Sequence, residues 1–258
     1  MQIITLTTDF GTQDWFVGTM KGVILSLAPR ATIVDLTHEI PAGDIRSGAF
    51  ELAAGCRFFP KGTIHVAVVD PGVGGARKAI AVQTADYFFV GPDNGVLSFA
   101  LAREKIKLVH RLEKASYLLH PVSHTFHGRD IFAPVAAHLW RGVPVQRFGP
   151  AQKGFIRLSW PEPRVGSNRI AGEVVFIDRF GNAITNIENG NLKTRRDTEI
   201  FAGRKRLCQV KAFYQSVPAG RAVAVAGSSG FLEIAVNGGS AAKRFRLKIG
   251  DRINVRWS

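Results

Sequence analysis

The chain has 258 residues, a length that predicts one large or two medium domains. Hydrophobic residues make up 46% and charged residues 21%, as in globular proteins, and no apolar run reaches the roughly 18 residues that span a membrane. The opening MQIITLTTDF lacks the basic and apolar segments of a secretion signal. We therefore expect a cytoplasmic protein without membrane association, in which Cys56 and Cys208 are buried thiols.

The net charge of +14 raises the question of nucleic-acid binding, because Lys and Arg clusters bind phosphates. Residues 166–258 carry 16 basic and 7 acidic side chains, a net charge of +9. The excess lies in turns such as KTRRD, GRKR and AKRFRLK, without the interleaved aromatic residues of a base-stacking surface. A solvated basic face is the favoured interpretation, and no nucleic-acid partner is expected.

Strand and helix patterns alternate through the first 150 residues. The β-branched run 4–10 includes an acid, and Asp14 is placed to cap a helix over 15–29. Asp44 is placed to cap a second helix that ends near residue 58. Further strands are expected at 31–40, 63–70, 79–85, 87–92 and 107–113, and further helices at 95–104 and 129–140. This alternation predicts a layered α/β domain with a mostly parallel sheet, spanning residues 1–158.

The pattern changes after about residue 150. The stretch 159–169 holds two prolines and no apolar periodicity, so we interpret it as a linker. Beyond it, short extended segments recur at intervals of roughly 8–12 residues. They cover 171–178, 182–188, 198–203, 206–213, 221–228, 231–236, 243–249 and 253–258. This pattern predicts an all-β domain, a barrel or a sandwich, over residues 166–258.

Aspartates follow two of the strands expected in the first domain. Asp9 lies in TTDFGT and Asp70 in VVDPGVGGAR. Ligands of open α/β sheets bind at the carboxyl ends of strands, where an acid can accept hydrogen bonds from ribose hydroxyls. A turn-forming or helix-capping role is the alternative for either residue alone. Two acids on buried strands together indicate a site.

The loop after Asp70 is rich in glycine. Gly72, Gly74 and Gly75 allow close approach of backbone to a ligand. The order G-V-G-G-A-R matches neither the dinucleotide fingerprint nor the P-loop, so phosphate binding is weakly supported. Arg77 ends the loop and can return to pair with Asp70.

Histidines gather in LLHPVSHTFHGRD, at positions 120, 124 and 127. Three histidines could bind a catalytic zinc ion, although their spacing straddles Pro121 and disfavours this interpretation. His127 precedes Gly128 and an expected helix, and it is the histidine most suited to face a cleft.

The second domain holds two further polar clusters. Asp178 and Asn182 flank a turn at Gly181, and an asparagine amide suits the edge of adenine, with a turn-forming role as an equal alternative. Ser228 and Glu233 lie in GSSGFLEIAVNGGSA. Glu233 stands between two apolar residues of an expected strand, which is unusual for an acid.

Seven short motifs occur in order along the chain: TTDFG, HEIPAGD, VVDPGVGG-x-R, GPDNG, TFHGRD, IDRFGN and GFLEIAVN. Together they resemble the motifs of the S-adenosyl-L-methionine hydroxide adenosyltransferases, relatives of the fluorinase and chlorinase. The motifs extend over about residues 5–240, nearly the whole chain. The resemblance implies an α/β domain followed by a β domain. It also implies a homotrimer whose active sites lie between the first domain of one subunit and the second domain of the next.

The resemblance implies roles for individual residues. Asp70, Arg77 and His127 match the residues that position and polarise the nucleophilic water. The remaining matches are substrate-binding: Asp9 for the ribose, Asp178 for the methionine ammonium, Asn182, Phe213 and Val236 for the adenine, and Ser228 with Glu233 as a further contacting pair. No metal or cofactor is implied, since S-adenosyl-L-methionine is the substrate.

Departures from the family pattern bear on the choice between its activities. The halogenases have an insertion after the strand at 79–85, a tyrosine at the position of Asp70 and a serine at that of Gly128, whereas this chain has the hydrolase features. Gly43 stands where the fluorinase has a tryptophan, and Gly227 replaces a frequent asparagine. Contacts to the methionine end of the substrate therefore stay open.

The expected reaction is hydrolysis of S-adenosyl-L-methionine to adenosine and L-methionine by in-line attack of water on ribose C5′. The sulfonium is already an activated leaving group, so the enzyme must supply a nucleophile, with His127 or Asp70 taking the proton. Which sulfonium epimer is used stays open. The alternatives are a halogenase, a basic nucleic-acid-binding protein, and a zinc hydrolase built on the three histidines.

Overall fold

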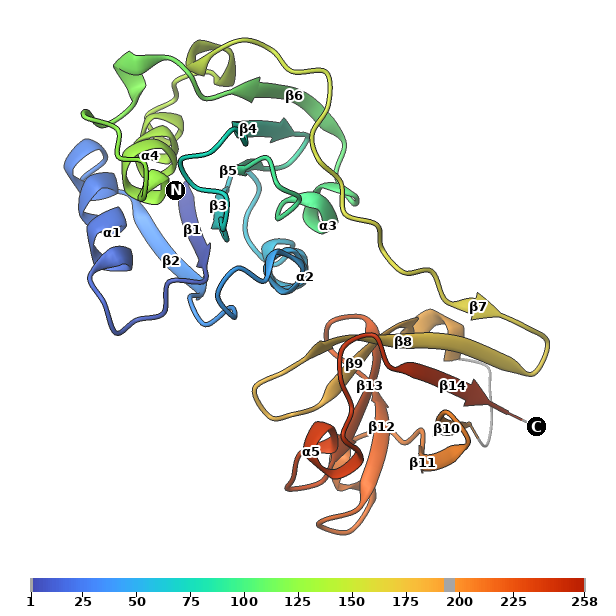
Figure 1. Cartoon of the computed structure of the whole chain (residues 1–258). Helices are drawn as coiled ribbons and strands as arrows, with labels where there is room; N and C mark the ends of the chain where they lie inside the picture. The colour runs from blue at the N-terminus through green and yellow to red at the C-terminus, as the bar shows by residue number, and fades with distance from the viewer. Residues whose placement is uncertain (1, 193–197, 258) are drawn as a thin grey trace. The chain divides into compact units, whose positions relative to one another are not determined.

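The computed structural model describes residues 2–192 and 198–257 (Figure 1). They form two compact units, Met1–Ser159 (unit 1) and Trp160–Ser258 (unit 2), each with its own hydrophobic core. Within the described part of the chain, no helix combines the length and the apolar character that crossing a bilayer requires.

Unit 1 is built on a six-stranded sheet in the order β2-β1-β3-β5-β4-β6. The neighbours β2, β1, β3 and β5 are parallel, whereas β4 runs antiparallel to both β5 and β6. The strands are β1 (Ile3–Thr8), β2 (Thr32–Thr37), β3 (Ile64–Val68), β4 (Ala79–Thr84), β5 (Phe88–Pro92) and β6 (Ile106–Arg111). Every residue of β3 is buried, as expected for a parallel strand that is covered on both faces. The prediction of a mostly parallel α/β sheet is confirmed.

Helices cover both faces of this sheet (Figure 1). On one face, α1 (Phe16–Leu27) and α4 (Ala133–Trp140) pack on β1 and β3 through side chains such as Ile24. On the other face, α2 (Ile45–Cys56) and the short α3 (Ser98–Leu101) form a second core around Phe89. Three short helical turns complete the unit: η1 (Ala115–Tyr117), η2 (Gly128–Phe132) and η3 (Val145–Phe148).

The helix starts confirm one capping prediction and correct another. The Asp44 carboxylate accepts a hydrogen bond from Ser47 N and caps α2, as predicted. The prediction that Asp14 caps α1 is wrong, because Trp15 already has helical dihedral angles and occupies the cap position without a side-chain bond. The helix expected at 95–104 is also shorter than predicted, since Gly95 has a φ of +103° and α3 begins only at Ser98.

Unit 2 is an antiparallel sheet in the order β11-β10-β14-β8-β9-β13-β12, with β7 paired to β8. A parallel bridge from Val210, just after β11, to Ala224 of β12 joins the two edges, so the sheet nearly closes on itself. The strands are β7 (Arg164–Val165), β8 (Arg169–Ile177), β9 (Ala183–Glu188), β10 (Glu199–Ala202), β11 (Lys205–Gln209), β12 (Ala222–Ala226), β13 (Phe231–Val236) and β14 (Arg252–Arg256). The predicted all-β second domain is confirmed.

Helical turns interrupt unit 2 at η4 (Asn189–Leu192), η5 (Tyr214–Ser216) and α5 (Ala241–Phe245). The last corrects the strand expected at 243–249. Ser240 caps α5 by accepting a hydrogen bond from Lys243 N, and Arg246 ends it in the left-handed conformation. A local cap with two helix-forming alanines therefore outweighs the alternating pattern of KRFRLKI. Cys208 in β11 and Cys56 in α2 are buried free thiols, as predicted.

His65 in β3 is fully buried against the rings of Tyr87 and Phe89, and its Nδ1 lies 2.7 Å from Thr5 Oγ1. Burial lowers the pKa of His65 from 6.5 to about 3. The unfolded chain therefore binds a proton between these pH values and the folded chain does not. We therefore expect the free energy of unfolding to decrease as the pH is lowered below 6.5. This residue contributes at most about 1.4 kcal/mol per pH unit to that decrease.

Chemical denaturation at pH 7.5 and pH 5 tests this expectation. The control is the double variant Thr5→Val, His65→Phe, which removes both polar partners together. It should lose less stability than the natural chain over the same pH interval. Equal losses in the two proteins would show that His65 does not titrate in this way.

Candidate active site

The carboxyl end of β3 carries a buried ion pair. Asp70 lies two residues beyond the end of β3, and Arg77 returns to it from the loop before β4. Arg77 Nε donates to Asp70 Oδ1 at 3.0 Å and to Oδ2 at 2.8 Å, and Nη2 also donates to Oδ2. The side chains are only 4% (Asp70) and 11% (Arg77) exposed. The pair is therefore geometrically specific and largely screened from water.

His127 joins this pair at Arg77 Nη2, the nitrogen that also donates to Asp70. Its Nδ1 lies 2.6 Å from Arg77 Nη2, and a guanidinium can only donate, so Nδ1 is the acceptor. The neutral ring must then carry its proton on Nε2. Burial, with a smaller contribution from the Arg77 charge, lowers the pKa of His127 below 6.5. The structure thus unites the three predicted catalytic residues in one hydrogen-bonded chain, with His127 neutral.

The glycine-rich loop is shaped by the segment that leads to His127. Gly74 has a φ of +75°, and a Cβ added there would lie 2.2 Å from the carbonyl oxygen of His124. Both the conformation and the space therefore require glycine. The loop that delivers Arg77 and the segment that delivers His127 are packed directly on one another.

Asp9 follows β1, and its Oδ2 accepts a hydrogen bond from Gly43 N at 2.8 Å. Burial raises the pKa of Asp9, and the Asp70 charge raises it further, so the two carboxylates interact electrostatically. His38 holds this turn on both sides. Its Nδ1 lies 2.8 Å from Thr8 Oγ1, and its carbonyl accepts from Gly11 N at 2.7 Å. Asp9 is thus fixed between two anchored neighbours.

Two further polar residues stabilise this region. Asn94 Nδ2 donates to the carbonyl of Val69 and steadies the chain next to Asp70. Asp130 is fully buried and accepts from Ser123 N and from Arg129. The GPDNG and TFHGRD motifs contain both residues. The adjacent Arg129 and Asp130 suggest an ion pair from the sequence alone, whereas the contacts to Val69 and Ser123 depend on the fold.

Among the described residues, the histidine cluster is not arranged as the zinc interpretation requires. His120 Nε2 bonds the carbonyl of Ala115, and His127 Nδ1 faces Arg77. Across residues 2–192 and 198–257, no group of three or more His, Cys, Asp or Glu side chains is arranged to hold a metal ion.

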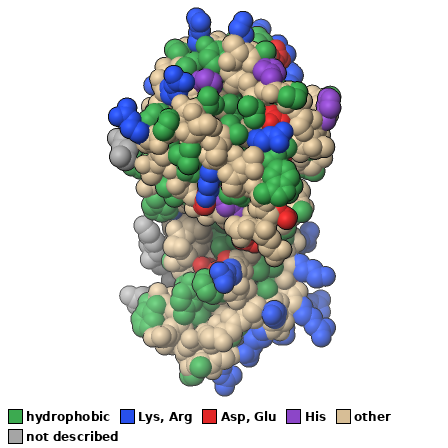
Figure 2. Space-filling view, turned by 90° about the vertical axis from the view of Figure 1, so that its left-hand side faces the viewer, with side chains coloured by type: hydrophobic (Ala, Val, Ile, Leu, Met, Phe, Trp, Pro, Cys, Tyr) green, Lys and Arg blue, Asp and Glu red, His purple; other side chains and the backbone are tan. Residues whose placement is uncertain are grey.

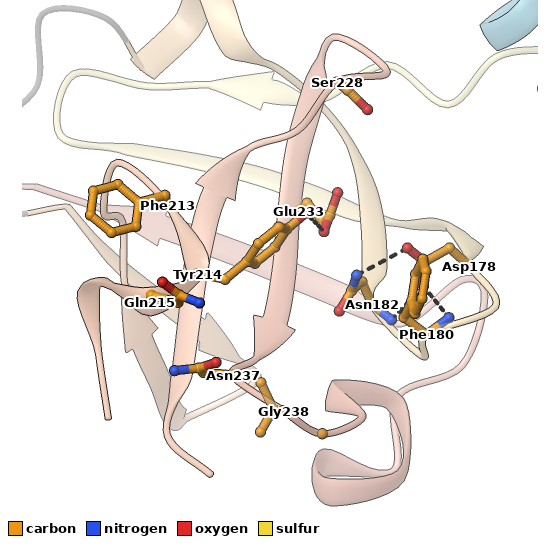
Figure 3. A pocket seen from close by; sticks show the side chains of 12 residues that line it. Asp178, Phe180, Asn182, Phe213, Tyr214, Gln215, Ser228, Glu233, Asn237 and Gly238 are labelled. Atoms are coloured by element: carbon orange, nitrogen blue, oxygen red, sulfur yellow. Dashed lines mark hydrogen bonds between the residues drawn. The ribbon is translucent and has the colours of Figure 1, made fainter. Parts of the chain in front are cut away.

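Unit 2 contains a pocket of about 840 Å³ (Figure 3). It is lined by all six residues that the sequence predicted for this domain: Asp178, Asn182, Phe213, Ser228, Glu233 and Val236. The others that line it are Phe180, Tyr214, Gln215, Asn237, Gly238 and Gly239, which the sequence analysis did not single out. Several of these follow a predicted residue directly or lie within a quoted motif, which was the available signal. We call this cavity the acidic pocket.

The turn that precedes β9 carries both Asp178 and Asn182. Asp178 Oδ1 accepts from Phe180 N and Asn182 N, and its Oδ2 accepts from Asn182 Nδ2 at 3.0 Å (Figure 3). Gly181 has a φ of +79°, and a Cβ there would overlap Ser240 Oγ. The turn is therefore locked against the start of α5, and the predicted turn-forming role and a ligand-facing position coexist.

Glu233 is the second carboxylate of the acidic pocket. It is 5% exposed, and Tyr214 OH donates to its Oε1 at 2.6 Å (Figure 3). Burial raises the pKa of Glu233, and the Asp178 charge raises it further. Two carboxylates thus face one cavity, and no Lys or Arg is among the described residues that line it. Such a pocket favours a cation.

Aromatic side chains border the same pocket. Phe180 is 74% exposed and Phe213 is 60% exposed, high values for large apolar residues. Rings that present a face at a pocket mouth can stack on a planar ligand or on another protein surface.

Comparison with known proteins gives the class to which this fold and these sites belong. The family model described as the SAM hydroxide adenosyltransferase N-terminal domain matches residues 4–149, and that of the C-terminal domain matches residues 172–254. The chain belongs to the SAM hydroxide adenosyltransferase family.

Individual relatives extend this result. The chain is 40% identical over 255 residues to the (R)-S-adenosyl-L-methionine hydrolase of Salinispora tropica, covering 98% of this chain and 97% of the relative. It is 38% identical to the hydrolase of the same name from Thermus thermophilus, with 97% and 98% covered. The fluorinase of Nocardia brasiliensis is 26% identical, with 98% and 96% covered. A crystal structure of an uncharacterized conserved protein from Thermotoga maritima is 37% identical with a TM-score of 0.92, covering 99% of this chain and 100% of that one.

The packing of Gly74 can be tested against a matched glycine. Gly62 also has a positive φ, +86°, but a Cβ there would meet nothing within 4 Å. Gly62→Ala should cost about 1–2 kcal/mol from backbone strain alone. Gly74→Ala should cost at least about 1 kcal/mol more, because the new methyl group overlaps His124. Denaturant melts measure both, and equal losses would contradict the contact.

Proposed function

We propose that this protein hydrolyses S-adenosyl-L-methionine, in its (R)-sulfonium form, to adenosine and L-methionine. Family membership and the relatives named (R)-S-adenosyl-L-methionine hydrolase, at 38–40% identity, support this reaction. The observation that carries it is the Asp70–Arg77–His127 chain, a carboxylate and a neutral imidazole held around one guanidinium at a strand end.

The acidic pocket suits the proposed substrate by charge and by shape. S-adenosyl-L-methionine carries a sulfonium and an ammonium cation, and Asp178 and Glu233 supply two carboxylates. Asp178 is proposed to meet the ammonium by a charge-assisted hydrogen bond. The Asn182 amide, the Phe213 ring and the Val236 backbone suit the adenine, with Ser228 a further contact and Asp9 binding the ribose hydroxyls.

The proposed nucleophile is a water molecule held beside Asp70. Asp70 accepts bonds from Arg77, yet a carboxylate has about four lone-pair sites, so one is left for a water hydrogen. The water oxygen then presents its lone pair to ribose C5′, opposite the sulfur. Holding it in line can contribute about 7–11 kcal/mol through effective molarity.

The tautomer of His127 supports one direction of proton movement in the proposed reaction. Because Nδ1 accepts from Arg77, the free edge of the ring is an Nε2–H donor and cannot take a proton. We therefore assign the proton of the attacking water to Asp70, and His127 is proposed to orient the water oxygen. The C5′–S bond breaks as the C5′–O bond forms, and neutral methionine sulfur leaves with the bonding pair.

The same groups favour water over a halide ion as the nucleophile. A carboxylate at Asp70 accepts hydrogen from water, whereas it repels an anion. A serine at Gly128 would also need its neighbours to move, since a Cβ there lies 3.1 Å from Met20 Sδ and from Phe126. A fixed Arg77 charge beside the water and a sulfonium leaving group make a metal unnecessary in the proposed mechanism.

The proposed assembly is a homotrimer in the cytoplasm, in which unit 1 of one subunit and unit 2 of the next complete each active site. The exposed rings of Phe180 and Phe213 at the mouth of the acidic pocket support a covering partner surface.

Incubation with each purified sulfonium epimer, followed by chromatography for adenosine and methionine, tests the proposed reaction. We expect both products from the (R) epimer and at least about tenfold slower turnover of the (S) epimer, since only one epimer aligns C5′–S with the water. Asp70→Asn should lower the rate by about 10²–10⁴, whereas Asp86→Asn, an acid paired with Lys61, should not. A product that depends on added halide, or no reaction of either epimer, would contradict the proposal.

The pH dependence tests the role of His127. Its neutral form is required and its pKa lies below 6.5, so kcat/KM should stay level from pH 8 to 6.5 and fall below that pKa. In His127→Asn the side-chain oxygen can still accept from Arg77 without titrating. The fall of kcat/KM on the acid side should then move to lower pH. An unchanged fall would mean that another group is responsible for it.

A further inference from the structure

Unit 2 has a second pocket, of opposite charge to the first. It encloses about 410 Å³ between β11, β12 and α5, and shares no lining residue with the acidic pocket. Four cationic residues line it, Arg206, Lys211, Arg221 and Arg244, and the described lining residues include no Asp or Glu. Lys and Arg side chains gather along one flank of unit 2, at the lower right of Figure 2. We call this cavity the basic pocket.

The four cations are held in two ways. Arg244 Nη1 donates to the carbonyl of Gly220, and Arg206 Nε pairs with Glu199 Oε1 at 2.6 Å. For Lys211 and Arg221, the described residues supply no side-chain hydrogen bond or ion pair. Two positioned guanidinium groups therefore stand beside two cations whose donors are available.

The walls distinguish this cavity from an open solvated face. The Phe245 ring, with Lys205 Nζ 5.4 Å and Arg244 5.7 Å from its centre, forms one side. Val217 and Pro218 form another. Like charges gathered against apolar walls repel one another, and an anion with several oxygens relieves that repulsion. Guanidinium forks match the paired oxygens of carboxylate and of phosphate, and a phosphate group offers more oxygens and more charge to share among four cations.

One turn connects the basic pocket with the acidic pocket. The turn 217–221 lines the basic pocket, and Asn237 lines the acidic one. Asn237 makes three hydrogen bonds to this turn: its Nδ2 to Val217 O, its O from Gly220 N, and its N to Arg221 O. Arg244 grips the same turn through Gly220. An anion that draws Arg221 and Arg244 together therefore acts on the turn 217–221, to which Asn237 is hydrogen-bonded.

We propose that the basic pocket binds a small phosphate-bearing molecule, and that the turn 217–221 couples its occupancy to the acidic pocket. The coupling rests on the proposed function of the acidic pocket, whereas the binding does not. The remaining source of the same phosphate chemistry is a nucleic-acid backbone, which the experiment separates.

Calorimetric titration of the full chain with pyrophosphate at fixed ionic strength tests the binding. Arg221→Gln and Lys211→Gln should each weaken binding by about tenfold or more, the loss expected for a charge-assisted bond. The matched control is Lys248→Gln, an exposed lysine outside the basic pocket, which should change affinity by less than about twofold. All three residues are at the surface or pocket edge, so the variants should fold.

Three outcomes would overturn the proposal or part of it. Absence of pyrophosphate binding, or equal weakening by Arg221→Gln and Lys248→Gln, removes the site. Binding of a single-stranded RNA that needs Arg221, without binding of pyrophosphate, assigns the pocket to a nucleic-acid backbone instead. Pyrophosphate that binds but leaves KM for S-adenosyl-L-methionine unchanged removes the coupling. Support requires a KM shift of at least about twofold that Arg221→Gln abolishes.

Discussion

The guanidinium of Arg77 donates to the Asp70 carboxylate and to His127 Nδ1, and both directions are fixed because arginine has no acceptor. This single constraint sets the tautomer of His127 and leaves a free lone pair on Asp70. The surrounding loop fits this arrangement, since Gly74, in the loop that carries Arg77, lies against the His124 carbonyl in the segment that carries His127. One guanidinium donor group thus fixes the positions of a carboxylate and an imidazole.

Charge is separated within unit 2 in a way that its net value conceals. The excess of +9 over residues 166–258 could suggest a uniformly basic surface. Instead, the larger pocket is lined by two carboxylates, and four cations gather around a smaller one. Each pocket therefore has a local field of its own sign, and a net charge predicts neither.

Local sequence rules predicted the elements whose signals act over a few residues. Buried parallel strands such as β3 and the Asp44 cap follow from apolar runs and from one acid at a helix start. The errors fell where neighbouring geometry decides. Trp15, not Asp14, occupies the cap position of α1. Ser240 caps α5 in a segment whose alternating pattern predicts a strand.

The candidate site shows the same division between local and distant information. Strand-end acids and family motifs located the residues, but their mutual contacts depend on distant segments. That His127 accepts from Arg77, and so cannot act as the base from its free edge, needs the fold. Tyr214 was likewise missed, because its partner Glu233 lies on another element and no short pattern links them.

Glu233 shows how such a distant contact bears on turnover. It is an acid in a strand whose residues are all buried, and Tyr214 OH donates a hydrogen bond to it. Gly227 leaves room for its carboxylate, since a Cβ there would lie 3.0 Å from Oε2, so the family's frequent asparagine would crowd it. The raised pKa shows that burial and Asp178 oppose its charge. A sulfonium in the acidic pocket relieves that opposition. In the proposed reaction the sulfonium charge vanishes when C5′–S breaks, so the carboxylates lose their attraction to that cation, although Asp178 keeps its bond to the methionine ammonium. The lost attraction favours separation of adenosine from the pocket.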